Sequence, residues 1–278
     1  MNAGVGTMTG SEADRSSRLG AAARVLGVVC LRTWKKTARR PVTLLFSLVQ
    51  PLMWMLFFGF LFHRYPIADA TRPGVSYTSF LLPGICAMTV LFGASQAGIP
   101  LLHDLQTRFL PRLLGTPASH GLVLAGKLGA DVARLLAQAA VVLVIGLLVG
   151  ARLAATPGAV AGGVLALALF AGAFASLSCL IALKTRAQES MAAFVHVVNM
   201  PLLFTSSALV PARQMPAWLQ EAARWNPLTL AVNALRGALL DGVAPSPGGC
   251  LLPLGALALI LFLLAARAMR GAAHDEEA

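Results

Sequence analysis

The stretch from Ser206 to Gly242 reads SSALVPARQMPAWLQEAARWNPLTLAVNALRGALLDG, and it lies between two apolar runs of membrane length. Charged residues and prolines break this stretch too often for it to cross a bilayer. Trp218 and Trp225 lie seven residues apart, so they share one face of a short helix and predict anchoring at a membrane surface. Asn226 followed by Pro227 predicts a helix cap with proline at the first helical position. We therefore expect two short helices that meet at Asn226 on the outer face, with these four residues as interfacial anchors.

The composition of the whole chain predicts a membrane protein. Of 278 residues, 57% are hydrophobic and 12% are charged, whereas about a quarter are charged in a typical soluble domain. Six runs approach or exceed the roughly 20 residues that a crossing helix needs. They cover about 41–62, 77–102, 128–151, 158–183, 190–210 and 249–268, and the third and fifth contain polar residues. We therefore expect an all-α integral membrane protein with a six-span domain over 41–268 and both termini on one side.

The net charge of +11 is distributed unevenly over this topology. Sixteen of the 22 lysines and arginines fall on the side of the termini. The other six are Arg64, Arg72, Arg152, Arg213, Arg224 and Arg236. The positive-inside rule then predicts that both termini are cytoplasmic. Because the basic residues flank spans and no separate soluble domain carries them, we expect no nucleic-acid partner.

The segments outside the spans have simpler patterns. Residues 1–18 are rich in Gly, Ser and Thr and predict a disordered tail. Residues 19–40 mix apolar and basic residues, which favours an amphipathic helix on the cytoplasmic surface, although a charge cluster that only stops membrane transfer is the alternative. Residues 269–278 are expected to form a cytoplasmic tail. Arginine outnumbers lysine eighteen to four, which suggests a GC-rich bacterial genome and therefore a bacterial plasma membrane.

The run Gly121 to Leu128, GLVLAGKL, has the glycine and lysine spacing of a phosphate-binding P-loop. Leu128 replaces the hydroxyl that would hold magnesium, no strand pattern precedes Gly121, and the following residues enter a span. We therefore expect no nucleotide, metal or other cofactor on this chain. Its five histidines and four cysteines also lack ligand spacing, and no catalytic constellation is present, so we expect no enzyme active site.

A polar stripe marks the third span. Lys127, Asp131, Arg134 and Gln138 recur at helical spacing and should share one face. An isolated charge at the bilayer centre costs about 2.5–3.5 kcal/mol, so this face should meet protein, water or headgroups. The stripe is either an ion-paired end of the helix or part of cargo passage and conformational coupling.

The largest internal loop runs from Leu101 to Lys127 and contains an amphipathic turn, Phe109 to Leu114. A short helix here could dock in a groove on a soluble partner, or rest on the bilayer surface.

Three segments together resemble the membrane subunits of type-2 ABC exporters, especially the daunorubicin and doxorubicin resistance permeases. They are QPLMWMLFFGFLF (50–62) with the basic residues that precede it, RLLGTPAS (112–119), and the stretch from Ser206 to Gly237. YTSFLLPGI (77–85) also fits, and the resemblance covers about residues 24–268. It implies a connecting helix, six spans, a coupling helix between spans two and three, and short outer helices before span six.

The resemblance also implies partners. Two permease subunits, identical or homologous, would pair above two copies of a separate P-loop ATPase that binds ATP and magnesium. The implied ATPase-coupling residues are Arg108, Leu110, Arg112, Leu113, Leu114, Gly115 and Pro117. Family members often have an acidic residue and a glycine before this loop. This chain has the acidic Asp104, but Thr107 and Phe109 stand nearby, which departs from that pattern.

The implied activity is export of an amphiphilic drug or antibiotic across the lipid bilayer. We expect spans one, two and five to line the route, with Gln50, Trp54, Phe58, Gln96, His196 and Asn199 as candidates. Export of a polysaccharide or lipid-linked glycan is the alternative within the family. An ATP-independent carrier or an immunity protein is the alternative from another class, although the spans are poor in the carboxylates that an ion-coupled carrier needs.

Overall fold

The computed structural model describes residues 41–62, 76–107, 120–154, 156–240 and 248–274, and these ranges contain helices but no β-strand. The helices are α2 Pro41–Leu61, α3 Tyr77–Ser95, α4 Gly98–Gln106, α6 His120–Leu148, α7 Pro157–Thr185, α8 Gln188–Phe204, α9 Ala217–Trp225, α10 Pro227–Leu239 and α11 Gly248–His274. A 3₁₀ turn, η1 Ala212–Gln214, precedes α9. The predicted all-α class is confirmed for these ranges.

Four helical segments in the described residues are long and apolar enough to cross a membrane: Tyr77–Gln106, Gly121–Leu148, Pro157–Thr185 and Gly248–Gly271. They correspond to the second, third, fourth and sixth predicted spans. The helices α2 and α8, at the first and fifth, are 21 and 17 residues long.

The second span is not the continuous helix that its apolar sequence predicted. It consists of α3 and α4, which are separated by Gln96 and Ala97. Pro100 contributes to this break, because it has no N–H to donate to the carbonyl four residues earlier.

The other helix ends also differ from the predicted limits. The third helix begins at His120, before the predicted limit of 128, so Lys127 lies within it and pairs there with Asp131. The fifth ends at Phe204 rather than 210, where residues 205–210 turn back toward α9. The sixth continues to His274, so much of the predicted tail is helical.

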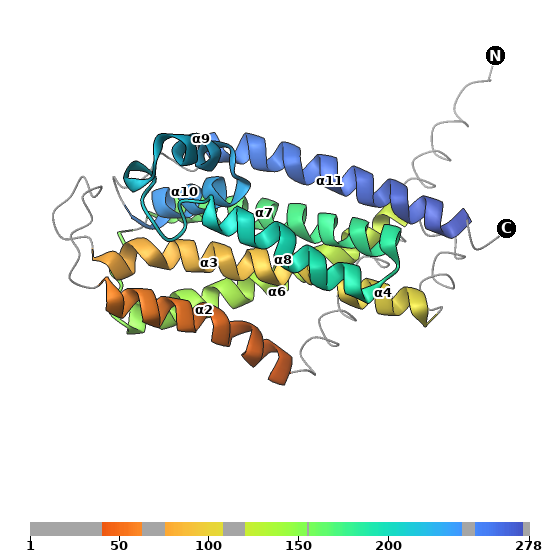
Figure 1. Cartoon of the computed structure of the whole chain (residues 1–278), viewed down its shortest axis with the longest axis horizontal. Helices are drawn as coiled ribbons and strands as arrows, with labels where there is room; N and C mark the ends of the chain where they lie inside the picture. The colour runs from red at the N-terminus through yellow and green to blue at the C-terminus, as the bar shows by residue number, and fades with distance from the viewer. Residues whose placement is uncertain (1–40, 63–75, 108–119, 155, 241–247, 275–278) are drawn as a thin grey trace, which may run out of the picture.

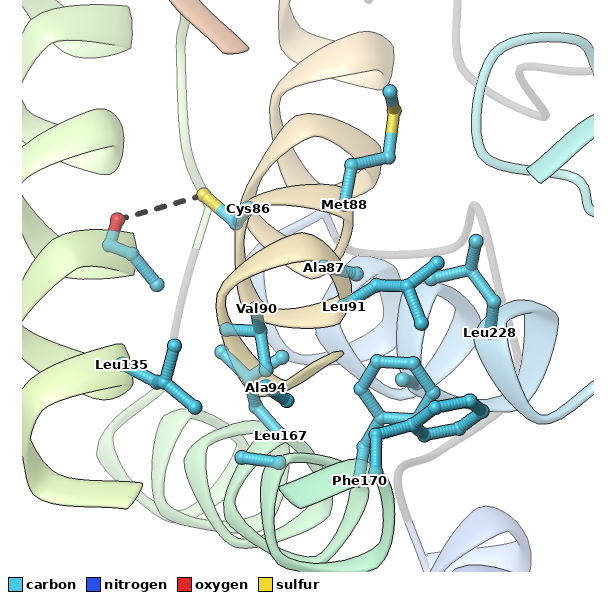
Figure 2. Packing of buried hydrophobic residues seen from close by; sticks show 14 of the residues in the cluster. Cys86, Ala87, Met88, Val90, Leu91, Ala94, Leu135, Leu167, Phe170 and Leu228 are labelled. Atoms are coloured by element: carbon cyan, nitrogen blue, oxygen red, sulfur yellow. Dashed lines mark hydrogen bonds between the residues drawn. The ribbon is translucent and has the colours of Figure 1, made fainter. Parts of the chain in front are cut away.

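The helix α7 lies at the centre of the bundle and packs against α3, α4, α6, α8, α10 and α11 (Figure 1). Phe170 of α7, Leu91 of α3, Leu135 of α6 and Leu228 of α10 are fully buried in one apolar cluster (Figure 2). Small residues permit this packing: a Cβ on Gly163 of α7 would lie 2.6 Å from the Cβ of Ala238 on α10. The small residues Gly163 and Ala238 therefore allow α7 and α10 to approach closely.

The bundle has two distinct ends. The ends of α4 and α11 lie at one end, which we call the α4 end (Figure 1). The short helices α9 and α10 lie toward the opposite end, the α9 end (Figure 1).

The two short helices have different surroundings. The helix α10 packs against α7 and α3 and buries most of its residues. The helix α9 exposes nearly all of its surface, and Trp218 and Trp225 are 72% and 76% exposed. Only α9 therefore has the exposure expected of a surface helix, while α10 belongs to the core of the bundle.

Candidate functional site

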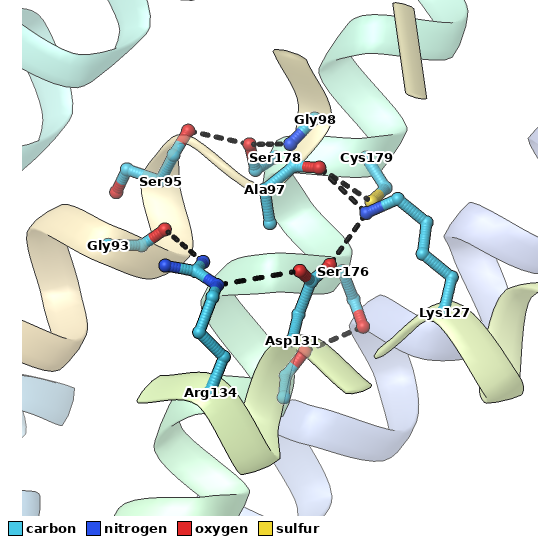
Figure 3. A network of polar contacts seen from close by, with 11 residues as sticks. Gly93, Ser95, Ala97, Gly98, Lys127, Asp131, Arg134, Ser176, Ser178 and Cys179 are labelled. Atoms are coloured by element: carbon cyan, nitrogen blue, oxygen red, sulfur yellow. Dashed lines mark hydrogen bonds and ion pairs between the residues drawn. The ribbon is translucent and has the colours of Figure 1, made fainter. Parts of the chain in front are cut away.

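The break between α3 and α4 is held by one side chain of α7. The Ser178 hydroxyl donates to the Ser95 carbonyl at 2.6 Å and accepts from the Gly98 N–H at 2.9 Å (Figure 3). The contact is close, since a Cβ on Gly98 would lie 2.4 Å from the Ser178 carbonyl oxygen. A single hydroxyl thus bridges the end of α3 and the start of α4.

The stripe on α6 contacts the same break. Lys127 Nζ donates to the Ala97 carbonyl at 2.7 Å and to Asp131 Oδ2 at 2.6 Å (Figure 3). Arg134 Nε lies 3.9 Å from Asp131 Oδ1, and Arg134 Nη1 donates to Gln138 Oε1 at 3.3 Å. Lys127, Asp131 and Gln138 are buried. The prediction that the four residues share one face is confirmed, and that face meets protein.

The helix α8 reaches the break through Asn199. Its Oδ1 accepts from the Ser95 hydroxyl at 2.8 Å, and the side chain is fully buried. Among the described residues, no hydrogen-bond partner reaches its Nδ2. Ser95 therefore contacts α7 through its carbonyl and α8 through its hydroxyl.

The six residues predicted to line a cargo route differ in their surroundings. Gln50, Gln96 and His196 are exposed, whereas Asn199 is buried. Trp54 and Phe58 stack at 5.3 Å between ring centroids, and Phe58 stacks on Phe62 at 5.9 Å. Trp54 and Phe58 thus form a stacked pair on α2, and Phe62, directly after this helix, extends the stack.

The predicted ATPase-coupling residues, from Arg108 to Pro117, lie outside the described residues, as do 1–40. The last described residue before them is Thr107, directly after α4. The first one after them is His120, at the start of α6. The segment is therefore flanked by α4, which begins at the break, and by α6, whose Lys127 bonds to the break.

The run Gly121 to Leu128 is helical throughout and lies in α6. A P-loop binds phosphate with a loop that follows a strand, so this run has the wrong local structure for that role. Its Lys127 is engaged with Asp131 and the Ala97 carbonyl.

At the α9 end, Asn226 forms the predicted helix cap and also contacts the end of α8. Its Oδ1 accepts from the Leu228 N–H at 2.8 Å, which confirms the predicted cap of α10. Its Nδ2 donates to the Leu202 carbonyl at 2.7 Å and to Thr205 Oγ1 at 2.9 Å. Asn226 therefore also joins the start of α10 to the end of α8.

Arg236, one of the six basic residues predicted for the outer side, has a buried side chain. It is 3% exposed, and its guanidinium carbon lies 3.7 Å from the centroid of the Phe80 ring. Its Nε donates to the Phe80 carbonyl at 3.3 Å and its Nη2 to the Ala208 carbonyl at 3.1 Å. The burial of Arg236 could have been predicted from the sequence. Arg236 lies at helical spacing from Thr229 and Val232, so the three residues share the buried face of α10.

We expect Arg236→Lys to lower the free energy of unfolding in detergent by about 1.5 kcal/mol. The planar guanidinium fork reaches two carbonyls and stacks on an aromatic ring, and a compact ammonium cannot replace these contacts together. Arg224→Lys on exposed α9 is the matched control and should change stability by less than about 0.5 kcal/mol. Equal effects of the two substitutions would contradict the assigned role of Arg236.

The fold and these contacts define a multi-pass helical membrane protein. Its network of paired charges lies inside the bundle, whereas large apolar side chains such as Leu252, 84% exposed, cover outer faces. The chain belongs to the ABC-2 type transporter family, whose model matches residues 24–240. This membership makes it a membrane permease, a transport component of an ABC system, and confirms the resemblance found in the sequence.

Relatives from different organisms agree with this assignment. The chain is 30% identical over 204 residues to the daunorubicin resistance ABC transporter permease protein DrrB1 of Streptomyces coeruleorubidus. This match covers 73% of this chain and 70% of that protein. It is 34% and 31% identical to the ycf38 transport permeases of Pyropia yezoensis and Cyanophora paradoxa. Those matches cover 74% and 76% of this chain and 69% and 72% of the relatives.

Proposed function

We propose that this chain is the membrane-spanning subunit of an ATP-driven exporter that moves an amphiphilic drug or antibiotic across the bacterial plasma membrane. The observation that carries the proposal is the broken second span. Its inner part, α4, leads directly into the predicted ATPase-coupling segment and is hydrogen-bonded at the break to the core helices α6 and α7. Family membership and the similarity to a daunorubicin resistance permease support the same function.

In the proposed topology, α2 and α8 are the first and fifth of six spans and the α4 end faces the cytoplasm. The distribution of lysine and arginine supports this orientation. The predicted connecting helix, 19–40, would lie on the inner surface. At the opposite end, the exposed Trp218 and Trp225 of α9 would rest among the outer headgroups.

ATP and magnesium would be bound by two copies of a separate P-loop ATPase below a pair of permeases, identical or homologous. An ATPase can drive a permease only if it contacts two permease conformations with different free energy. The segment from Arg108 to Pro117 is the proposed contact, because it connects α4 to α6.

The proposed cargo class follows from the resistance permease that this chain resembles. Cargo would pass between the two permease copies, along the candidates Gln50, Trp54, Phe58, Gln96, His196 and Asn199. An ion-coupled carrier is a weaker proposal, because the buried carboxylate Asp131 is paired with Lys127.

A pull-down tests the subunit role. When the tagged chain is purified from its native membrane in mild detergent, a second polypeptide that contains a P-loop and hydrolyses ATP should co-purify with it. Leu114→Asp should reduce the amount of this polypeptide at least about tenfold, because a charge would replace an apolar anchor of the docking surface. Leu114→Met is the control and should retain it. The docking assignment is wrong if Leu114→Asp, correctly inserted in the membrane, retains the ATPase in full.

A further inference from the structure

The break in the second span leaves backbone groups that the helices themselves do not satisfy. Inside a bilayer such groups need partners within the protein. Here the Ser95 carbonyl and the Gly98 N–H are both bonded to the Ser178 hydroxyl, and the Ala97 carbonyl is bonded to Lys127. These partners are side chains of α7 and α6. Rotation of α4 about the break would therefore exchange side-chain bonds without unwinding a helix.

The helix α4 also packs differently from α3. Leu102 of α4 belongs to a small apolar cluster with Ala182 of α7 and Met191 and Phe194 of α8. The buried side chains of α3 belong instead to the main core with α6, α10 and α11. Leu101 of α4 lies in the main core, so α4 packs against both clusters, whereas no described residue of α3 belongs to the small one.

The length of α3 places the break near one boundary of the bilayer. Nineteen residues of helix extend about 28 Å, close to the roughly 30 Å of the hydrocarbon core. The remaining nine residues of α4 extend about 13 Å toward the predicted coupling segment. Lys127 lies seven residues after the start of α6, on the other side of that segment. The break is therefore bonded to both helices that the coupling segment joins.

We propose that residues 96–97 are the hinge of the second span and that Ser178 and Lys127 are positioning residues for transport. They tie α4 to the core, so that displacement of the coupling segment moves α6 and α7 as well. This inference rests on the proposed function for its link to ATP, but the hinge itself is a property of this chain. Without the Ser178 bridge, α4 would move while the core helices do not follow.

The test compares two buried serines of α7. The Ser178 hydroxyl bridges the break, whereas the Ser176 hydroxyl donates to the Gly172 carbonyl of its own helix at 2.7 Å. Ser178→Ala and Ser176→Ala are made in the complex with its ATPase, reconstituted in liposomes, with daunorubicin as the transported probe. Ser178→Cys, which keeps a weak donor of similar size, covers the case in which Ser178→Ala does not fold.

We expect Ser178→Ala to raise the ATP hydrolysed per daunorubicin transported about fivefold, the factor that loss of one hydrogen bond gives in a two-state equilibrium. Ser178→Cys should give an intermediate ratio and Ser176→Ala the wild-type ratio. A second readout needs no cargo: amide hydrogen exchange in the peptide over 96–106 should be about fivefold faster in Ser178→Ala, by the same factor, and unchanged in Ser176→Ala.

The outcomes separate the hinge from the proposed function. If the wild-type complex does not transport daunorubicin with ATP, the cargo or the exporter role is wrong, while the exchange result still decides the hinge. If wild-type transport is coupled and Ser178→Ala keeps both the wild-type ratio and the wild-type exchange rate, the hinge assignment is overturned. Equal effects of the two serine substitutions also overturn it, because they indicate a general loss of packing.

Discussion

Replacing Asp131 by leucine should lower the free energy of unfolding by about 3–5 kcal/mol, because it leaves the buried Lys127 and the half-buried Arg134 without a carboxylate. Lys127 Nζ lies 2.6 Å from Asp131 Oδ2, and Arg134 Nε lies 3.9 Å from Oδ1. Asp131 is 4% exposed, so water cannot replace the lost partner without penetrating the bundle. The measurement is reversible unfolding in mixed micelles.

The double variant Lys127→Met with Asp131→Leu shows whether the pair itself is responsible. Replacing both members of a buried ion pair by apolar residues is often close to neutral, so the double variant should be more stable than Asp131→Leu alone. Glu189→Ala on the exposed start of α8 is the control for loss of an acidic residue. A loss below about 1 kcal/mol for Asp131→Leu, or no recovery in the double variant, would contradict the assigned pairing.

Replacing Gly84 by valine should lower the free energy of unfolding by about 3 kcal/mol, because the contact there has no room for a side chain. A Cβ on Gly84 would lie 2.2 Å from the backbone oxygen of Ala208. That same oxygen accepts the hydrogen bond from Arg236 Nη2. Any shift that relieves the clash therefore also disturbs Arg236 and the turn that follows α8.

Gly129→Val is the matched control for Gly84→Val. Gly129 lies in the interior of α6, and a Cβ there would meet nothing within 4 Å. The control should change the free energy of unfolding by no more than about 0.5 kcal/mol, as is usual for exposed helix positions. If the two valine variants unfold at the same denaturant concentration, the close approach of residues 205–210 to α3 is not as described.

Much of the helical framework could be predicted from the sequence. Apolar runs of membrane length locate the long helices, because backbone polar groups in a bilayer need partners within the protein and a helix supplies most of them within its own segment. The Asn226–Pro227 pair correctly marks the start of α10, since the cap depends on local side-chain chemistry. The polar stripe on α6 was likewise predictable from helical spacing alone.

The break in the second span could not be located in the same way. No charge interrupts residues 77–102, and hydropathy alone does not distinguish one helix from two. Gly98 and Pro100 were the available signals, because proline lacks the N–H that would continue the helix. Lys127 lies 30 residues in sequence from the carbonyl that it bonds, and Ser178 lies 80 and 83 residues from its two partners. Such pairings depend on tertiary packing.

The measurement that tests the central claim most directly is uptake of daunorubicin into inside-out membrane vesicles that contain this chain and its ATPase. The account predicts uptake that requires ATP hydrolysis, stops with vanadate and is absent when either subunit is missing. Uptake that continues without ATP hydrolysis, or that proceeds at the same rate without this chain, would show that it is not the permease subunit of an ATP-driven exporter of this drug.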